Sequence, residues 1–220
     1  RQSLALVNGT GLASNYLINS RTAEVTGRPV TISGSRSYDS TTTADSSILT
    51  ITSGVSGESL SLTGAGILGA ASAGTQTITN NNTLAIADGT GSASNYTLNG
   101  ASINVTVIPK TLNVTLAREY DGTTTVAGAL LTPTFDSLQG GETLAISGTG
   151  SVANANVGSS KAVTLGTMEL AAGSGNPSNY SLNSVLLDVT QRVINLDGIR
   201  AYDATTNVLS SDINTFGNIV

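Results

Sequence analysis

The feature of this sequence that most constrains its fold is an internal repeat with a period of 82 residues. An Arg-x-Tyr-Asp motif recurs three times at that interval. Its members are Arg36, Tyr38 and Asp39, then Arg118, Tyr120 and Asp121, then Arg200, Tyr202 and Asp203. Thin solenoids have repeats of up to about 50 residues. The longer period therefore predicts small folded units in series.

Two further motifs recur in step with the first. A Ser-Asn-Tyr motif ends at Tyr16, Tyr96 and Tyr180, and a Gly-Glu-Ser/Thr-Leu motif begins at Gly57 and Gly141. Together the motifs divide the chain into four parts. These are the C-terminal part of a preceding repeat (1–27), two complete repeats (28–109 and 110–191) and the N-terminal part of a following repeat (192–220). We expect the chain to be an internal piece of a longer protein.

Alternation of apolar and polar residues predicts β-strands within each unit. The alternating apolar positions begin and end both complete repeats: Val30 and Ile32, Leu112, Val114 and Leu116, Ile103, Val105 and Val107, and Val185, Leu187 and Val189. No segment has a convincing helical period. We therefore expect an all-β fold of antiparallel strands, in which small two-layer β-sandwich-like repeats form an elongated rod. A grasp-like sheet with a short covering helix is the alternative.

Composition argues against several classes of function. The chain has no Cys, no His and no Trp, which removes the thiolate nucleophile, the imidazole base and the usual zinc ligands. Its nine Lys and Arg residues are not clustered, and the net charge is −5, so we expect no nucleic-acid partner. No apolar run is long enough to span a bilayer. We expect no enzymatic activity and no membrane span in this piece.

The recurring carboxylates leave two chemical alternatives to consider. Two of them could flank a glycosidic bond, and hard oxygen ligands could hold a calcium ion. No dense Asp-x-Asp spacing supports calcium. We expect Asp39, Asp121 and Asp203 to cap turns, and Glu58 and Glu142 to lie at solvated strand ends. The sequence thus predicts no catalytic residue, no cofactor and no metal site.

All six tyrosines belong to the two aromatic motifs, which favours a structural role for them. Side chains two positions apart on a strand share a face, so Arg118 and Tyr120 point the same way. We expect Tyr120 to be mostly buried and to lock its own unit. We also expect Asp121 to accept hydrogen bonds from turn N–H groups, and Arg118 to cover the ring or pair with an acid.

Four stretches of the second complete repeat carry a family resemblance. They are Lys110-Thr111-Leu112-Asn113-Val114, Glu119-Tyr120-Asp121-Gly122-Thr123-Thr124-Thr125, Asn156-Val157-Gly158 and Ser178-Asn179-Tyr180-Ser181-Leu182. This pattern resembles the YDG-type repeat of very large bacterial surface adhesins that are similar to filamentous haemagglutinin and are exported by two-partner secretion. Repeat 28–109 departs from it, with Ser40 in place of the glycine. The resemblance implies export to the cell surface or biofilm matrix, a stalk of many copies and no catalytic residue.

These observations favour a structural stalk or spacer of an adhesin, which projects an adhesive domain away from the cell. The alternative is a module that binds a carbohydrate or receptor directly. Loops in both complete repeats are rich in Gly, Ser, Ala and Asn, and neither repeat concentrates aromatic or charged residues, which favours the spacer. The expected partners are neighbouring repeats of the same chain, with exopolysaccharide or a host surface contacted through other domains.

Overall fold

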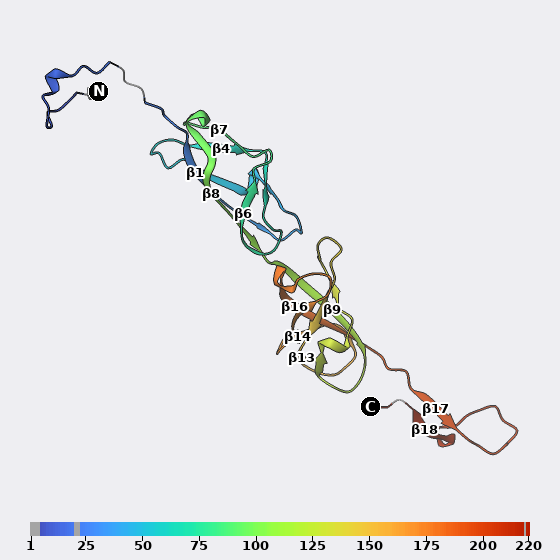
Figure 1. Ribbon diagram of the computed structural model, residues 1–220. Coiled ribbons are helices and arrows are strands. Elements are labelled where there is room, and N and C mark those ends of the chain that lie inside the picture. Colours follow the sequence, from blue (N-terminus) through green and yellow to red (C-terminus); the bar gives the residue numbers. More distant parts are fainter. Residues whose placement is uncertain (1–4, 20–22, 218) are drawn as a thin grey trace.

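The computed structural model describes residues 5–19, 23–217 and 219–220. Two complete β-rich units lie end to end along the chain (Figure 1). The described residues form no α-helix, only 3₁₀ turns of three residues. These turns are η1 (Ala13–Asn15), η2 (Ser46–Ile48), η3 (Ala93–Asn95), η4 (Gly128–Leu130), η5 (Pro177–Asn179) and η6 (Ser210–Asp212). The all-β fold with repeated units is confirmed.

Each complete unit is built from eight strands. The first unit contains β1 (Arg28–Ser37), β2 (Thr43–Asp45), β3 (Leu49–Thr52), β4 (Leu60–Thr63), β5 (Ala65–Leu68), β6 (Gly74–Asn80), β7 (Ala85–Asp88) and β8 (Tyr96–Ile108). The second contains β9 (Lys110–Glu119), β10 (Thr125–Ala127), β11 (Thr134–Phe135), β12 (Leu144–Ser147), β13 (Thr149–Val152), β14 (Gly158–Thr164), β15 (Glu169–Ala172) and β16 (Tyr180–Thr190). After it, β17 (Asn195–Gly198) and β18 (Ile213–Gly217) form a separate two-stranded sheet.

The main sheet of each unit has six strands, in the order β2-β5-β6-β8-β1-β3 and, in the second unit, β10-β13-β14-β16-β9-β11. The first and last strands of a unit are neighbours and run parallel, with Ile32 opposite Ile103 and Val114 opposite Val185. This differs from the expected antiparallel pairing. Parallel neighbours need a long crossover, and here the rest of the unit supplies it.

A two-stranded ribbon forms the second layer of each unit, β4 with β7 and β12 with β15. Its apolar side chains pack against the first and last strands: Leu60, Leu62 and Ile86 join Val30, Ile32 and Ile103 in one cluster. In the second unit Ile146 packs with Val114, Leu116, Val185 and Leu187. The predicted alternation is confirmed, because Val30, Ile32, Leu112, Val114 and Leu116 are all buried. No helix covers either sheet in the described part of the chain.

Only Pro109 separates the last strand of the first unit from the first strand of the second. Because the proline ring fixes one backbone angle, this link has little freedom. The segment after the second unit is different, since Ile194 and Leu196 are about half exposed there, at 50% and 52%. Among residues 192–217 and 219–220, strand pairing is limited to the antiparallel pair β17–β18.

Candidate functional site: the corner and the junction between units

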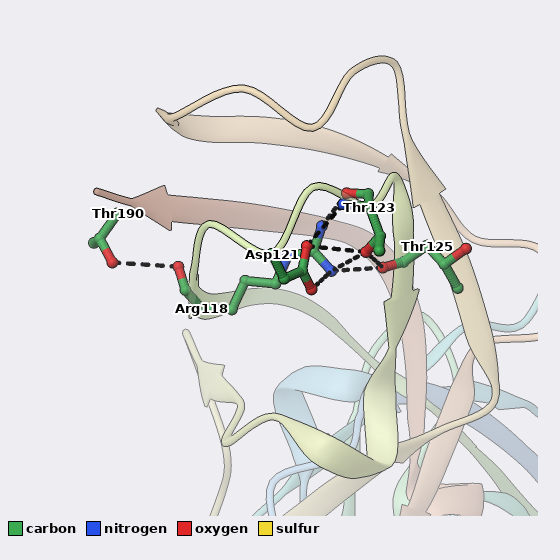
Figure 2. Close-up of polar contacts among 5 residues, drawn as sticks. All are labelled: Arg118, Asp121, Thr123, Thr125 and Thr190. Carbon is green, nitrogen blue, oxygen red and sulfur yellow. Dashed lines mark hydrogen bonds and ion pairs between the residues drawn. The ribbon is translucent and has the colours of Figure 1, made fainter. Parts of the chain in front are cut away.

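The Arg-x-Tyr-Asp motif forms a hydrogen-bonded corner at the end of the first strand (Figure 2). In the second unit, Arg118 Nη1 donates to the Thr125 carbonyl and Nη2 to the Thr123 carbonyl, both at 2.6 Å. Arg118 also pairs with Asp121 at 3.0 Å. Asp121 Oδ1 accepts the Thr123 N–H at 3.0 Å and its hydroxyl at 2.9 Å. The roles predicted for Asp121 and Arg118 are confirmed.

The same corner recurs in the other two copies. Asp39 Oδ1 accepts the N–H of Thr41 at 2.9 Å, and Arg36 pairs with Asp39 and donates to the Thr41 carbonyl. After the second unit, Arg200 pairs with Asp203 at 2.7 Å, and Asp203 accepts the Thr205 N–H at 3.0 Å. The corner therefore forms from local sequence, even where no complete unit surrounds it.

Hydrogen bonds lower the pKa of the corner aspartates. Burial acts to raise the pKa of Asp121, but the N–H and hydroxyl of Thr123 and the charge of Arg118 outweigh it, so the pKa falls below its ordinary value. For Asp203, the N–H and hydroxyl of Thr205 are the main causes of the lowered pKa. Both aspartates are therefore held in the charged form that caps the turn.

Tyr38, the tyrosine of the first unit's corner, contacts the second unit at the junction between the two units. The Tyr38 hydroxyl donates to Glu142 Oε1 at 2.6 Å, and the Tyr180 hydroxyl donates to Glu142 Oε2 at 2.5 Å. The two rings meet edge to face, with centroids 5.3 Å apart and planes at 76°. Gln139 N–H donates to the Tyr180 hydroxyl at 3.0 Å. One carboxylate of the second unit thus binds both recurring tyrosines.

Further contacts cross the same junction. The Ala73 N–H of the first unit donates to Asn179 Oδ1 of the second at 2.9 Å. One apolar cluster draws buried residues from both units: Tyr38, Ala44, Leu68, Val105 and Val107 from the first, and Leu112, Leu144 and Tyr180 from the second. The two units therefore share a core as well as a hydrogen-bond network.

The junction raises the pKa of both tyrosines. Burial and then the hydrogen bond to Glu142 raise the pKa of Tyr180 to about 12. The same causes, in the same order, raise the pKa of Tyr38. A neutral phenol can donate to a carboxylate, whereas a phenolate would repel it, so the site favours the protonated tyrosines.

The first unit carries the equivalent of half this site. Tyr96 donates its hydroxyl to Glu58, as Tyr180 does to Glu142, and the Tyr96 ring is 8% exposed. The hydrogen bond to Glu58, and then burial, raise the pKa of Tyr96. The expectation that Glu58 and Glu142 lie at solvated strand ends is therefore wrong. The recurring Gly-Glu pairs, Gly57-Glu58 and Gly141-Glu142, were the only sequence signal that these glutamates accept hydrogen bonds from buried tyrosines.

The six tyrosines differ in solvent exposure although their sequence motifs repeat. Tyr38, Tyr96 and Tyr180 are buried, Tyr120 is half-buried, and Tyr16 and Tyr202 are 67% and 92% exposed. The expectation that Tyr120 is mostly buried holds in part, because Tyr120 is partly buried against the apolar cluster of its own unit. Tyr38 is buried further, at 4% exposed, because a complete unit docks against it.

Residues 5–19, 23–217 and 219–220 contain no group of three His, Cys, Asp or Glu side chains placed to hold a metal ion. The described segments also contain no helix of the length and hydropathy needed to cross a membrane.

The fold and the junction define a tandem-repeat, all-β protein whose units dock head to tail. Two matches to the YDG domain cover residues 23–104 and 108–186, and the chain belongs to this family. No curated protein and no solved structure matches the chain.

Proposed function

We propose that this chain is a stalk segment of a large bacterial surface or biofilm-matrix adhesin, exported by two-partner secretion. Its repeats hold an adhesive domain away from the cell and have no enzymatic activity. The observation that carries the proposal is the junction at Glu142, where one carboxylate binds Tyr38 of one unit and Tyr180 of the next.

A stalk must limit bending between its units. Domains joined by a linker move relative to one another by default, unless their interface is large and hydrophobic. The junction meets this need with a shared apolar cluster, and Pro109 leaves only one residue between two long strands. The shared apolar cluster and the short link support a spacer role, because they keep the units extended and fixed in orientation.

Under this proposal, the direct binding partners of each repeat are the neighbouring repeats of the same chain. Exopolysaccharide or a host surface would be bound by other domains of the same protein, outside the cell. The carboxylates of the corner and of the junction support this assignment, because Asp121 and Glu142 already accept hydrogen bonds from neighbouring side chains.

Small-angle X-ray scattering of the 220-residue chain tests the proposal. Two units and their flanking segments, stacked end to end, should give a maximum dimension on the order of 100 Å, since strands rise about 3.3 Å per residue. The double variant Tyr38→Ala, Glu142→Ala should broaden the distance distribution by freeing the junction. A compact profile, or one that the double variant leaves unchanged, would contradict the stalk.

The competing role, direct ligand binding, predicts a different result. A glycan array probed with the same chain should then show saturable binding to a defined sugar. Under our proposal the chain shows none, and antibodies against these repeats label intact cells that carry the parent protein.

A further inference from the structure

Asn99 and Gly100 lie in an irregular part of β8, the last strand of the first unit. The pairing of β1 with β8 loses its regular register between Pro29 and Thr31 of β1. Residues 98–101 of β8 lie between the partners of these two residues, as extra residues do in a β-bulge. Asn99 and Gly100 are both exposed. An Asn-Gly pair is thus open to water and outside the regular ladder.

The surroundings of this pair leave room for a reaction of the backbone. Gly100 has a positive φ of 73°, and a Cβ added there would meet, apart from its chain neighbours, only Cγ of Pro29 within 4 Å, at 3.8 Å. The Asn99 N–H donates to Thr97 Oγ1 at 3.0 Å, while no described residue hydrogen-bonds to the Asn99 side chain. Nothing in the described part of the chain therefore holds this side-chain amide away from the next backbone nitrogen.

The second unit has the same asparagine in a different setting. Asn99 and Asn183 each follow the tyrosine of the Ser-Asn-Tyr motif by three residues, but Ser184 comes after Asn183. Nδ2 of Asn183 donates to Asn113 Oδ1 at 2.9 Å, which restrains the amide. Asn183 is nevertheless exposed, although the first unit is docked on the second. Docking of a neighbouring unit thus leaves this position accessible to water.

We propose that Asn99 deamidates spontaneously in the folded chain, because the open bulge leaves its side chain unrestrained beside a glycine. The Gly100 nitrogen loses its proton to solvent and attacks the side-chain carbonyl carbon of Asn99. The bond from that carbon to the side-chain nitrogen breaks, and this nitrogen takes up a proton and leaves as ammonia. Water then opens the resulting five-membered succinimide, which gives aspartate or isoaspartate. Glycine favours the attack because it has no side chain to hinder the approach of its nitrogen.

The reaction changes the charge of the chain and the length of the bulge. A neutral amide becomes a carboxylate, so the net charge at pH 7 goes from −5 to −6. Isoaspartate also places the β-carbon of Asn99 in the main chain. Residues 98–101 are outside the regular register, and the paired stretch that follows, Ser102–Ile108, is left intact. The modified chain therefore stays folded, and the protein becomes more acidic with age.

Prolonged incubation of the folded 220-residue chain in mildly alkaline water enriched in heavy oxygen tests the proposal. Peptide mapping by mass spectrometry should find heavy oxygen and isoaspartate at Asn99, with Asn183 unchanged and an unaltered circular dichroism spectrum. The other Asn-Gly pair, Asn8-Gly9, falls in a different tryptic peptide. Asn99→Gln is the matched control, since its longer side chain would have to close a six-membered ring and should not react.

The variant Ser184→Gly separates the effect of the structure from that of the Asn-Gly sequence. It gives the second unit the same pair, but Asn183 keeps its hydrogen bond to Asn113. In this variant Asn99 should react about two- to ten-fold faster than Asn183, the rate ratio that one side-chain hydrogen bond supports. Equal rates at the two asparagines would overturn the proposal. It also fails if Asn99 reacts only after the chain is unfolded in urea, because the folded bulge would then be protective.

Discussion

The hydroxyl of Tyr38 lies 2.6 Å from Oε1 of Glu142, although the two residues are 104 positions apart and belong to different units. Tyr38 belongs to the motif that marks its own repeat, yet its polar partner lies in the next one. The corner of which Tyr38 is part forms locally in all three copies. Local interactions of the corner thus orient the Tyr38 side chain, and contacts with the neighbouring unit bury it.

Replacing Glu142 should destabilise the junction. In Glu142→Ala both tyrosine hydroxyls lose their acceptor, and each unsatisfied buried group costs about 1–3 kcal/mol. Urea unfolding followed by far-UV circular dichroism should show this loss. The control is Glu169→Ala, which removes an exposed carboxylate from β15 and should change the free energy of unfolding by less than about 0.5 kcal/mol. Equal effects of the two substitutions would contradict a special role for Glu142.

The three corner tyrosines should differ in their contribution to stability according to their burial. Tyr38→Ala removes a buried ring and should cost about 3–5 kcal/mol, whereas Tyr202→Ala should cost less than about 0.5 kcal/mol. Tyr120 is half-buried, so Tyr120→Ala should fall between them. Denaturant melts of the three variants measure this order. A cost for Tyr202→Ala as large as that for Tyr38→Ala would contradict the dependence of stability on burial.

Stability should fall in alkaline solution because of the junction tyrosines. The pKa of Tyr180 is about 12 in the folded chain, against 10.0 ordinarily, so below pH 10 the phenol is neutral in both states and its contribution is complete. Between pH 10 and about 12 the unfolded chain releases the proton first, and the free energy of unfolding decreases as pH rises.

Urea midpoints measured across this pH range should show the decrease, and Tyr180→Phe should make it shallower. Phenolate absorbance should also show a titration step above the ordinary tyrosine pKa, and Tyr180→Phe should reduce its amplitude. Absence of any step above the ordinary pKa would argue against the junction.

Gly148 should be intolerant of any side chain. It adopts a φ of +74°, and an added Cβ would lie 2.0 Å from the Thr167 carbonyl oxygen, too close to fit without movement of the backbone. Gly141 has a similar φ of +73° but no heavy atom within 4 Å of such a Cβ. Gly141→Ala should therefore cost only the conformational strain, about 1–2 kcal/mol, and Gly148→Ala clearly more. Thermal melts compare them directly, and equal shifts would contradict the tight approach at Thr167.

Local patterns were enough to predict the strands and the corner. Alternation placed Val30, Ile32 and Leu112 on the buried face because side-chain direction on a strand has a period of two residues. Asp121 could be assigned to the turn because its partners, Thr123 N–H and hydroxyl, lie only two positions away.

Pairing and docking could not be predicted in the same way. The parallel contact between β1 and β8 joins residues about 70 positions apart, and nothing in either strand specifies which neighbour it takes. Glu142 was assigned to solvent because a carboxylate at a strand end is usually hydrated, and its true partners come from two distant motifs.

The period could be inferred from motifs that recur along the amino-acid sequence, and the β-strands and the capped corner from residues close together in the chain. The parallel pairing of first and last strands and the carboxylate shared by Tyr38 and Tyr180 became apparent only in the folded chain. It also separated Tyr38 from Tyr202, which have the same local motif but opposite exposure. Burial depends on everything that packs around a residue, and for Tyr38 part of that surrounding belongs to the next repeat.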